Sequence, residues 1–328
     1  MSLLEVDSLS VFFETNTART TAVRDLNFSL QPGVSLGIVG ESGSGKSQAV
    51  LAILGLLAGN GYCQGSAVFD GEQLIGATET QLNRLRGASI AMIFQDALGA
   101  LNPYLPIEIQ MTEVLTQHKK LGRRVAKIEA ISLLEAVGID SAEQRIKAYP
   151  HEFSGGMRQR VTIAMALLCR PKLIIADEPT TALDVTVQRQ VIDLLKQIQK
   201  DFGMAMIFIS HDLAVVSQVC DELMVLYAGR RMEQGPTQHL LKAPSHPYLK
   251  ALLGSMPDMH LAPGERLQTI PGNPPEVGHL SSACPFAQRC SEVMALCYQQ
   301  FPESRDLDVD HCVSCHRVEQ PMGSTSNF

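Results

Sequence analysis

Apolar residues along the chain follow two patterns that are typical of β-strands. Residues 3–13 alternate between apolar and polar positions, which predicts an edge strand, and residues 22–30 read as its antiparallel neighbour. Mostly apolar stretches predict four more strands, at residues 34–39, 89–94, 173–178 and 204–210. Continuous apolar strands are typical of a parallel sheet that is covered on both faces.

Helical patterns separate some of these strands. An apolar helix is predicted over residues 47–54, and helical periodicity extends from Glu108 to Lys120 and from Val125 to Val137. The pattern therefore predicts an α/β domain with a helical subdomain inserted at about residues 100–156. Residues 246–328 are expected to form a small cysteine-rich C-terminal extension.

Length and charge narrow the classes of function. A chain of 328 residues can bury a full α/β core and carry a second, smaller unit. Its formal net charge of −7 offers no basic field for a polyanion, so no nucleic acid is expected as a partner. The most apolar stretches are too short or too interrupted to span a bilayer, and the N-terminus lacks the pattern of a secretory signal. We therefore expect a cytosolic chain that reaches a membrane only through another protein.

The stretch between the strand at 34–39 and the following helix carries the clearest chemistry. It fits the pattern G-x-x-x-x-G-K-[ST] of loops that wrap nucleotide phosphates. The loop comprises Gly40, Glu41, Ser42, Gly43, Ser44, Gly45, Lys46 and Ser47, and Gln48 follows in the helix. Its amides and Lys46 are expected to bind the phosphates of a nucleotide, and Ser47 is expected to hold Mg²⁺. The fold class predicted from this loop is a P-loop NTPase (RecA-like) α/β core with an antiparallel edge sheet.

Other polar groups are predicted near the same nucleotide. Ser154, Gly155 and Gly156 begin a helix, with Ser154 as its N-cap, and form either a second anion-binding nest or an ordinary capped helix. Asp177 and Glu178 end one strand, and because adjacent strand residues face opposite sides, one can hold Mg²⁺ while the other faces the attacking water. The strand at residues 89–94 ends at Gln95, and Gly40, Asp177 and His211 follow strand ends, where ligands collect in open α/β sheets. Phe12 or Phe13 could stack on an adenine, and Phe13 is our candidate.

These motifs and their order resemble the ATP-binding subunits of ABC transporters over residues 1 to about 245. The correspondence covers the phosphate loop (Walker A), Gln95 (Q-loop), Ser154 to Arg158 (signature), Leu173 to Asp177 with Glu178 (Walker B), Ala182 to Asp184 (D-loop) and His211 (switch). The signature departs from the commoner form at Phe153 and Met157. The resemblance implies that Lys46, Gln95, Glu178 and His211 take part in ATP hydrolysis, that Ser47, Gln95 and Asp177 organise Mg²⁺, and that Asp184 belongs to the site. It also implies that the Ser154–Gly156 nest closes on the ATP of a second ATPase subunit.

Three further segments resemble the dipeptide and oligopeptide importer ATPases, namely residues 95–103, 246–253 and 270–275. This resemblance implies ATP-driven peptide uptake by a complex on the cytoplasmic face of the cell (inner) membrane. The implied partners are a second ATPase subunit in a heterodimer, two transmembrane permease subunits and, indirectly, an extracytoplasmic solute-binding protein. A nickel complex, glutathione or an opine-like compound are alternative cargoes, and a soluble ABC ATPase that acts on ribosomes or DNA is the alternative class.

Five cysteines lie close together near the C-terminus, in the pattern Cys284-x5-Cys290-x6-Cys297 and then Cys312-x2-Cys315. Four thiolates in one short segment suit either tetrahedral Zn²⁺ or an iron–sulfur cluster, and unliganded reduced cysteines are the alternative. The family resemblance implies a [4Fe–4S] cluster held by Cys284, Cys290, Cys297 and Cys315, with Cys312 as the second choice for the fourth ligand.

Overall fold

The computed structural model describes residues 2–15, 18–181, 183–256, 269–275 and 282–318. The chain divides into two compact units. The first unit comprises Met1–Leu3, Leu30–Ser35 and Gly76–Ile209, and the second comprises Leu4–Ser29, Leu36–Ile75 and Ser210–Phe328. In the described parts of the chain, no helix combines the length and the apolar character needed to cross a bilayer.

The first unit contains parallel strands whose ends carry predicted site residues. Strand β7 (Leu173–Asp177) lies between β8 (Ala205–Ser210) and β6 (Ile90–Ile93), and all five β7 residues are buried. Gln95 therefore follows the end of β6, and Glu178 follows the end of its neighbour β7. These strands confirm three of the apolar stretches predicted above.

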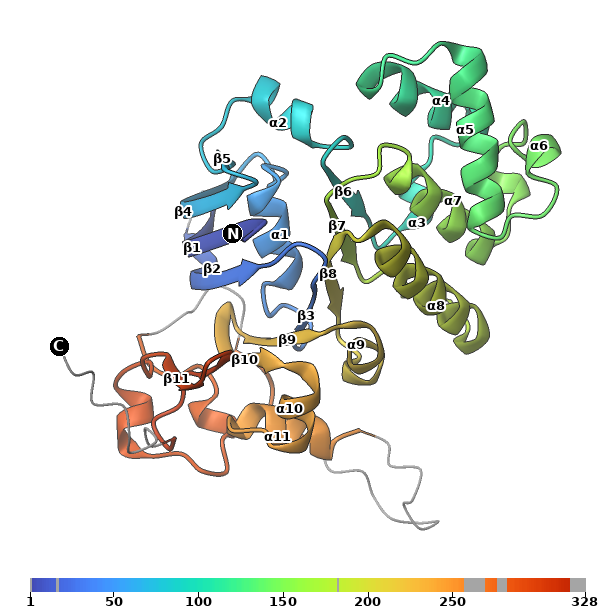
Figure 1. Ribbon diagram of the computed structural model, residues 1–328. Helices are drawn as coiled ribbons and strands as arrows, with labels where there is room; N and C mark the ends of the chain where they lie inside the picture. The colour runs from blue at the N-terminus through green and yellow to red at the C-terminus, as the bar shows by residue number, and fades with distance from the viewer. Residues whose placement is uncertain (1, 16–17, 182, 257–268, 276–281, 319–328) are drawn as a thin grey trace, which may run out of the picture. The chain divides into compact units, whose positions relative to one another are not determined.

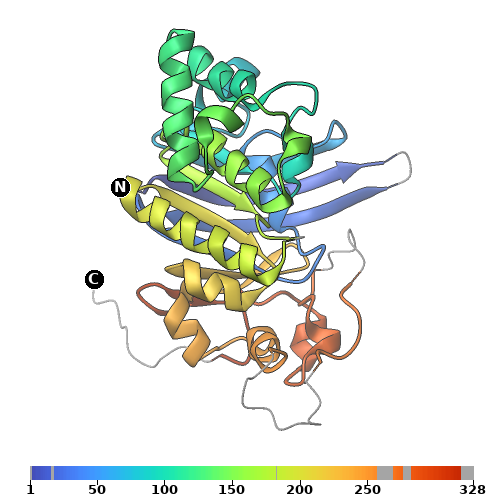
Figure 2. The same ribbon diagram turned by 90° about the vertical axis from the view of Figure 1, so that its right-hand side faces the viewer.

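Helices make up most of the remainder of this unit (Figure 1). They are α2 (Glu79–Leu85), α3 (Ala97–Ala100), α4 (Ile107–His118), α5 (Arg123–Ala136), α6 (Ala142–Arg145), the 3-10 turn η1 (Pro150–Glu152), α7 (Gly155–Leu167) and α8 (Val185–Phe202). Figure 2 shows α4 to α7, in green, gathered into one bundle.

The two predicted helices of the bundle are confirmed as α4 and α5. Ile107, Met111 and Leu115 recur every four residues along α4 and are fully buried. Ala126, Ala130 and Leu134 do the same along α5, so each helix buries one apolar stripe. The small alanines of α5 let the two helices approach closely, and the two helices pack against each other.

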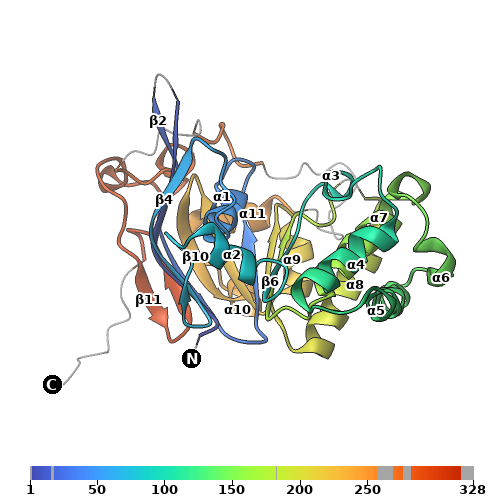
Figure 3. The same cartoon turned by 90° about the horizontal axis from the view of Figure 1, so that it is seen from above.

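The second unit contains an antiparallel sheet of four strands in the order β2-β1-β4-β5. They are β1 (Leu4–Glu14), β2 (Arg19–Leu30), β4 (Gly61–Phe69) and β5 (Glu72–Gln73), and α1 (Lys46–Ile53) packs against β1 and β4 (Figure 3). The prediction that residues 3–13 form an edge strand is wrong, because β4 pairs along the free side of β1. Strand β4 lacks a clear alternating pattern, and Gly65, at φ 103°, sits at an irregularity opposite Ser8, at φ 50°.

The other strands of this unit run in the order β11-β12-β10-β9-β3. Three of them are β3 (Ser35–Val39), β9 (Glu222–Tyr227) and β10 (Arg230–Pro236). The C-terminal segment, from residue 246 onward, adds β11 (Arg305–Asp308) and β12 (His311–Val313). The unit also contains α9 (Leu213–Val219) before β9, and between β10 and β11 it contains α10 (Thr237–Lys242), α11 (Pro247–Gly254) and the 3-10 turns η2 (Ala287–Arg289) and η3 (Ala295–Tyr298). The C-terminal segment is thus part of the second compact unit.

Glu233 of β10 holds this C-terminal segment in place. Its carboxylate is fully buried and accepts hydrogen bonds from the Ser245 and His246 amides at 2.9 and 2.8 Å. The His311 Nε2 atom lies 2.9 Å from the same carboxylate. A buried carboxylate with three partners joins β10, the start of α11 and β12.

Candidate functional site

The phosphate loop connects β3 to α1 in the second unit. Gly45 is the N-cap of α1 at φ 95°, and a Cβ atom there would lie 2.6 Å from the Ala22 carbonyl oxygen. Only glycine fits such a position, because a side chain would meet both backbone strain and a backbone atom. No side chain caps α1, so its first amides face the loop and can bind an anion.

Lys46 is held within this loop before any phosphate arrives. Its side chain is 5% exposed, and Nζ donates to the Gly40 carbonyl at 2.8 Å and to the Glu41 carbonyl at 3.0 Å. A third contact of 3.4 Å reaches the Ser44 hydroxyl. The lysine is thus oriented by the loop backbone. Ser42 and Gly43 are exposed at the tip of the loop, and Ser47 and Gln48 are half-buried in the first turn of α1.

Glu41 connects the phosphate loop to the C-terminal segment. Arg289 donates from Nη1 to both carboxylate oxygens of Glu41, at 3.0 and 2.8 Å, and to the Tyr227 hydroxyl at 3.0 Å. Its Nε donates to the Pro271 carbonyl at 2.9 Å. The Arg289 side chain is only 7% exposed, so this ion pair is substantially desolvated on the arginine side.

Aromatic side chains surround this ion pair. The Tyr248 hydroxyl accepts a hydrogen bond from the Glu41 amide at 3.1 Å, and burial raises the pKa of Tyr248, which keeps the hydroxyl neutral. Phe286 packs against Tyr227 and Tyr248 with ring centroids 5.3 and 5.1 Å apart. Phe286 lies between Cys284 and Cys290 in the sequence. The cysteine-bearing segment therefore packs against the tyrosines that contact the ion pair between Arg289 and Glu41 of the phosphate loop.

The first unit brings Gln95 and Glu178 together. Gln95 Nε2 donates to Glu178 Oε2 at 3.2 Å, and the Thr181 hydroxyl donates to the same oxygen at 2.9 Å. Glu178 has a φ of 45°, and its amide donates to the Ile209 carbonyl at 3.0 Å. This left-handed backbone turns the chain sharply after β7. Asp177, the last residue of β7, is 7% exposed.

Thr181 was not among the residues predicted from the sequence. A threonine three residues after a carboxylate that ends a strand was the available signal, because such a hydroxyl can return to the turn.

The predicted N-cap at Ser154 is confirmed. Its hydroxyl accepts from the Met157 amide at 3.3 Å. Gly155 has open space where a side chain would be, whereas a Cβ atom on Gly156 would meet the Val187 side chain. Asp184 caps α8 by accepting from the Val187 amide at 3.0 Å. The D-loop residue Ala182 lies outside the described residues.

Two other predicted residues lie in the second unit. His211 is exposed just before α9, whose N-cap is Asp212. Phe13 is half-buried, whereas Phe12 is 9% exposed and its ring is covered by the Arg19 guanidinium at 3.9 Å. Of the two aromatic candidates, Phe12 is therefore already stacked.

Four of the five C-terminal cysteines line one small cavity of about 10 Å³, together with His246 and Phe286. They are Cys284, Cys290, Cys297 and Cys315. The pKa of Cys284 is raised to about 11, mainly by burial and in part by the other three thiols, while a backbone hydrogen bond at Phe286 opposes the increase. Cys312 does not line this cavity, and it forms a hydrogen bond with Ser304. In the described residues, no three His, Cys, Asp or Glu side chains are arranged to hold a metal ion.

Two family models match parts of the chain. A model of the ABC transporter family matches residues 23–181, and a model of the oligopeptide/dipeptide transporter C-terminal region matches residues 232–297. The chain is 53% identical to the oligopeptide transport ATP-binding protein OppD of Escherichia coli, over 90% of this chain and 88% of that protein. It is 43% identical to the dipeptide transport ATP-binding protein DppD of Bacillus subtilis, over 97% and 95% of the two chains.

Solved structures show the same fold. The dimeric ATP-binding cassette MJ0796, bound to ADP and phosphate, matches 71% of this chain and 98% of its own, with a TM-score of 0.64 at 23% identity. The cbiO1 protein of Clostridium perfringens matches 74% and 91%, with a TM-score of 0.62 at 26% identity. By its sequence relatives and by its fold, the chain belongs to the ABC transporter ATP-binding proteins of the oligopeptide and dipeptide transporter family.

Proposed function

We propose that this protein hydrolyses ATP to drive the uptake of di- and oligopeptides through a membrane transporter. The observation that carries the proposal is the joint presence of an ABC phosphate loop and an oligopeptide-transporter C-terminal region in one chain. The Arg289–Glu41 ion pair joins the two regions. The curated relatives named above, an oligopeptide and a dipeptide transport protein, support peptides as the cargo.

Each hydrolytic role is proposed for a side chain with suitable chemistry. Lys46 and the loop amides bind the β- and γ-phosphates, and Phe13 supports the adenine. Glu178 polarises the attacking water, because its carboxylate is oriented by Gln95 and Thr181. His211 contacts the γ-phosphate. Phosphoryl transfer depends mainly on such positioning and on neutralising charge.

Magnesium fits the remaining oxygen donors. Ser47, Gln95 and Asp177 offer a hydroxyl, an amide oxygen and a carboxylate, which are hard ligands of the kind that Mg²⁺ prefers. Asp177 is a nearly buried carboxylate at a strand end, where a cation would compensate its desolvation. When bound, Mg²⁺ would supply neutralisation of the phosphate charge.

A second ATPase subunit completes the site in this proposal. Gly155 leaves open space beside the α7 N-terminus, so an anion can approach the Ser154–Gly156 nest. The partner's ATP would occupy this space, and ATP would hold the two subunits together until it is hydrolysed. Two permease subunits would convert this cycle into movement, with a solute-binding protein delivering peptide. The chain would act at the cytoplasmic face of the membrane, and another small solute is the alternative cargo.

The cysteine cavity is proposed to hold a [4Fe–4S] cluster. Support comes from the donor set, because four thiols line one cavity and the fifth is directed to Ser304. Zn²⁺ is the alternative metal, since it accepts the same four ligands. A brown protein that contains iron would support the cluster. A colourless protein that contains zinc would instead support Zn²⁺ at this site.

Substitution of Glu178 tests the hydrolytic role. Glu178→Gln keeps the shape of the side chain and removes the base, so ATP turnover should fall by about 10²-fold or more while ATP stays bound. Glu79→Gln, at an exposed surface carboxylate, is the control and should leave turnover unchanged. Near-normal hydrolysis in Glu178→Gln would remove this residue from the role. Peptide uptake into vesicles that contain the assembled transporter should fall in parallel.

A further inference from the structure

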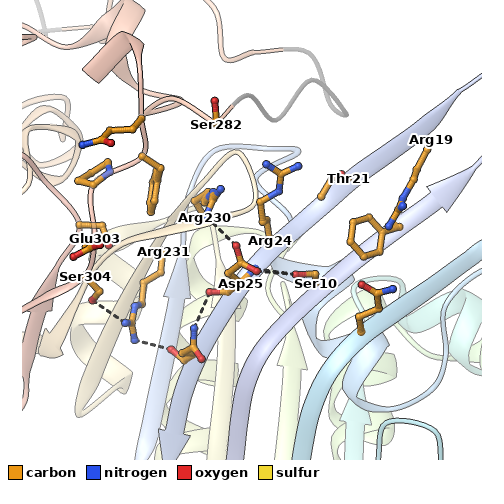
Figure 4. Close-up of a pocket in the computed structure, with 17 residues that line it drawn as sticks. Ser10, Arg19, Thr21, Arg24, Asp25, Arg230, Arg231, Ser282, Glu303 and Ser304 are labelled. Atoms are coloured by element: carbon orange, nitrogen blue, oxygen red, sulfur yellow. Dashed lines mark hydrogen bonds and ion pairs between the residues drawn. The ribbon is translucent and has the colours of Figure 1, made fainter. Parts of the chain in front are cut away.

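A cavity of about 870 Å³ in the second unit has no role in the nucleotide site described above. One wall is the face of the antiparallel sheet formed by Ser10 and Phe12 of β1 and Arg24 of β2 (Figure 4). The start of β10 and the coil at residues 300–304 form the other walls. Because successive strand residues face opposite sides, this face is the reverse of the one carrying Val11 and Phe13.

Positive charge dominates this cavity. Arg19, Arg24, Arg230 and Arg231 line it against only two carboxylates, Asp25 and Glu303, so its formal charge is +2. The whole chain carries −7. A local excess of guanidinium groups in an acidic protein is typical of a site that attracts an anion.

Two of these arginines are already committed to other contacts. Arg231 donates to the Asn27 carbonyl at 2.6 Å and to the Ser304 hydroxyl at 3.0 Å, which ties the C-terminal coil to the sheet. Arg19 stacks on the Phe12 ring. Neither requires a ligand to explain its position.

The other two arginines have unused hydrogen-bonding capacity. In the described part of the chain, the Arg24 guanidinium has no hydrogen bond or ion pair, and the buried Nε of Arg230 has no hydrogen-bond partner. Arg230 contacts Asp25 at 3.3 Å and lies over the Phe301 ring at 4.3 Å. Burial lowers the pKa of Arg230, and the charge of Asp25 opposes this shift. The charge of Arg24 lowers the pKa of Arg230 further, so the guanidinium groups of Arg24 and Arg230 lie close enough to repel each other.

We propose that this cavity binds a small phosphate-bearing molecule through Arg24 and Arg230, at a site separate from the ATP site. A phosphate group carries close to two negative charges at neutral pH and accepts several hydrogen bonds, so it can satisfy two neighbouring guanidinium groups together. The cavity volume lies within the range of small-molecule sites, which leaves space for an organic part beyond the phosphate. The ligand would contact both the antiparallel sheet and the C-terminal coil.

Binding of AMP to the full-length protein tests the proposal. Saturating ADP with Mg²⁺ first occupies the phosphate loop, and AMP or inorganic phosphate is then titrated by calorimetry. We expect one additional site in the wild type, and Arg24→Gln should weaken it by about tenfold or more, because a charge-assisted contact is lost. AMP binding tighter than phosphate would identify a nucleotide-like ligand, and equal affinities would identify the phosphate group as the recognised part. Both results support the site.

Controls separate this site from the phosphate loop. Arg24 makes no side-chain bond in the described chain, so Arg24→Gln should leave the melting temperature and ADP affinity unchanged. Arg84→Gln, an exposed arginine of the first unit, should leave AMP and phosphate binding unchanged. The proposal is overturned if the ADP-loaded protein binds neither probe, or if binding persists unchanged in both Arg24→Gln and Arg230→Gln. Loss of ADP binding would instead count against the proposed nucleotide site.

Discussion

Replacing Arg289 by methionine would leave the Glu41 carboxylate in the phosphate loop without its cation. Methionine keeps much of the length and packing of the arginine stem while it removes the charge and all of the donors. The variant loses the bonds to Glu41 and Tyr227, and also the bond to the Pro271 carbonyl. The loop would then carry an unpaired negative charge at its second residue.

The geometry of the pair sets the expected size of the effect. The N–O distances are 3.0 and 2.8 Å, and the side-chain exposures are 7% for Arg289 and 24% for Glu41. Two unit charges with centres about 4 Å apart attract by about 4 kcal/mol at an effective dielectric constant of about 20. The Glu41 carboxylate is about a quarter exposed and regains part of its hydration when the pair breaks. We therefore expect the net loss of interaction free energy in Arg289→Met to be about 2 kcal/mol. A fully buried pair would lose about 3–5 kcal/mol.

ATP affinity should report this change, because the freed carboxylate repels phosphate. A penalty of about 1.4 kcal/mol weakens binding about tenfold, and we expect at least this loss in Arg289→Met. Glu41→Gln removes the repelling charge, so the Glu41→Gln/Arg289→Met double variant should regain most of the affinity. Titration with a fluorescent ATP analogue measures all four proteins.

A matched control breaks an exposed ion pair of the same segment. Lys250→Met removes the partner of Glu292, where the exposures are 45% and 40%, and it should change ATP affinity by less than about 1 kcal/mol. Unchanged affinity in Arg289→Met would show that the ion pair does not hold the loop. A double variant as weak as Arg289→Met would show that the charge of Glu41 is not the cause.

Three further results are expected. Gly155→Ala places a methyl group in open space, so the monomer should melt as the wild type does while ATP-dependent pairing with the second ATPase, measured by gel filtration, is lost. Cys290→Ser should abolish the visible absorbance of the proposed iron–sulfur cluster, whereas Cys312→Ser should keep it, because Cys312 does not line the cavity. Burial lowers the pKa of His246 from 6.5 to about 3. Between pH 7 and pH 5 the histidine therefore takes up a proton in the unfolded chain but not in the folded one. This difference should lower the unfolding free energy of the wild type by about 2 kcal/mol over that range. His246→Asn lacks this loss, so its deficit in unfolding free energy should narrow over that range, and a constant deficit would contradict the assignment.

Chemistry at strand ends was predictable because it is local in sequence. Glu178 directly follows an apolar strand and Gln95 follows another, and parallel pairing of β6 with β7 then brings the two side chains within 3.2 Å. The N-cap at Ser154 was predictable for the same reason, since the Ser154 hydroxyl and the Met157 amide that donates to it lie three residues apart. Strands β11 and β12 were not predictable, because both are short and are ordered by pairing: β12 pairs with β10, and β11 pairs with β12.

Contacts between distant segments could not be predicted from patterns. Glu41 and Arg289 are 248 residues apart, and nothing in the sequence around either residue indicates the other. The same holds for Arg24 and Arg230, whose segments are joined by a hydrogen bond from the Arg24 amide to the Gly229 carbonyl, next to the start of β10. Periodicity reports which face of an element is buried, but it does not report which buried partner it meets.

The position of Arg289 gives the cysteine cavity a physical connection to the phosphate loop. Arg289 precedes Cys290 directly, and Phe286 lies between two of the cavity cysteines while it packs on the tyrosines around Glu41. A group that fixes the Cys290 thiol therefore also restricts the backbone from which Arg289 reaches Glu41. The conformational entropy of the Arg289 side chain would then already be reduced in the free protein, so ATP binding would not have to include this cost. Removal of the proposed cluster should consequently weaken ATP binding, as Arg289→Met does, and by less, because the charge of Arg289 remains.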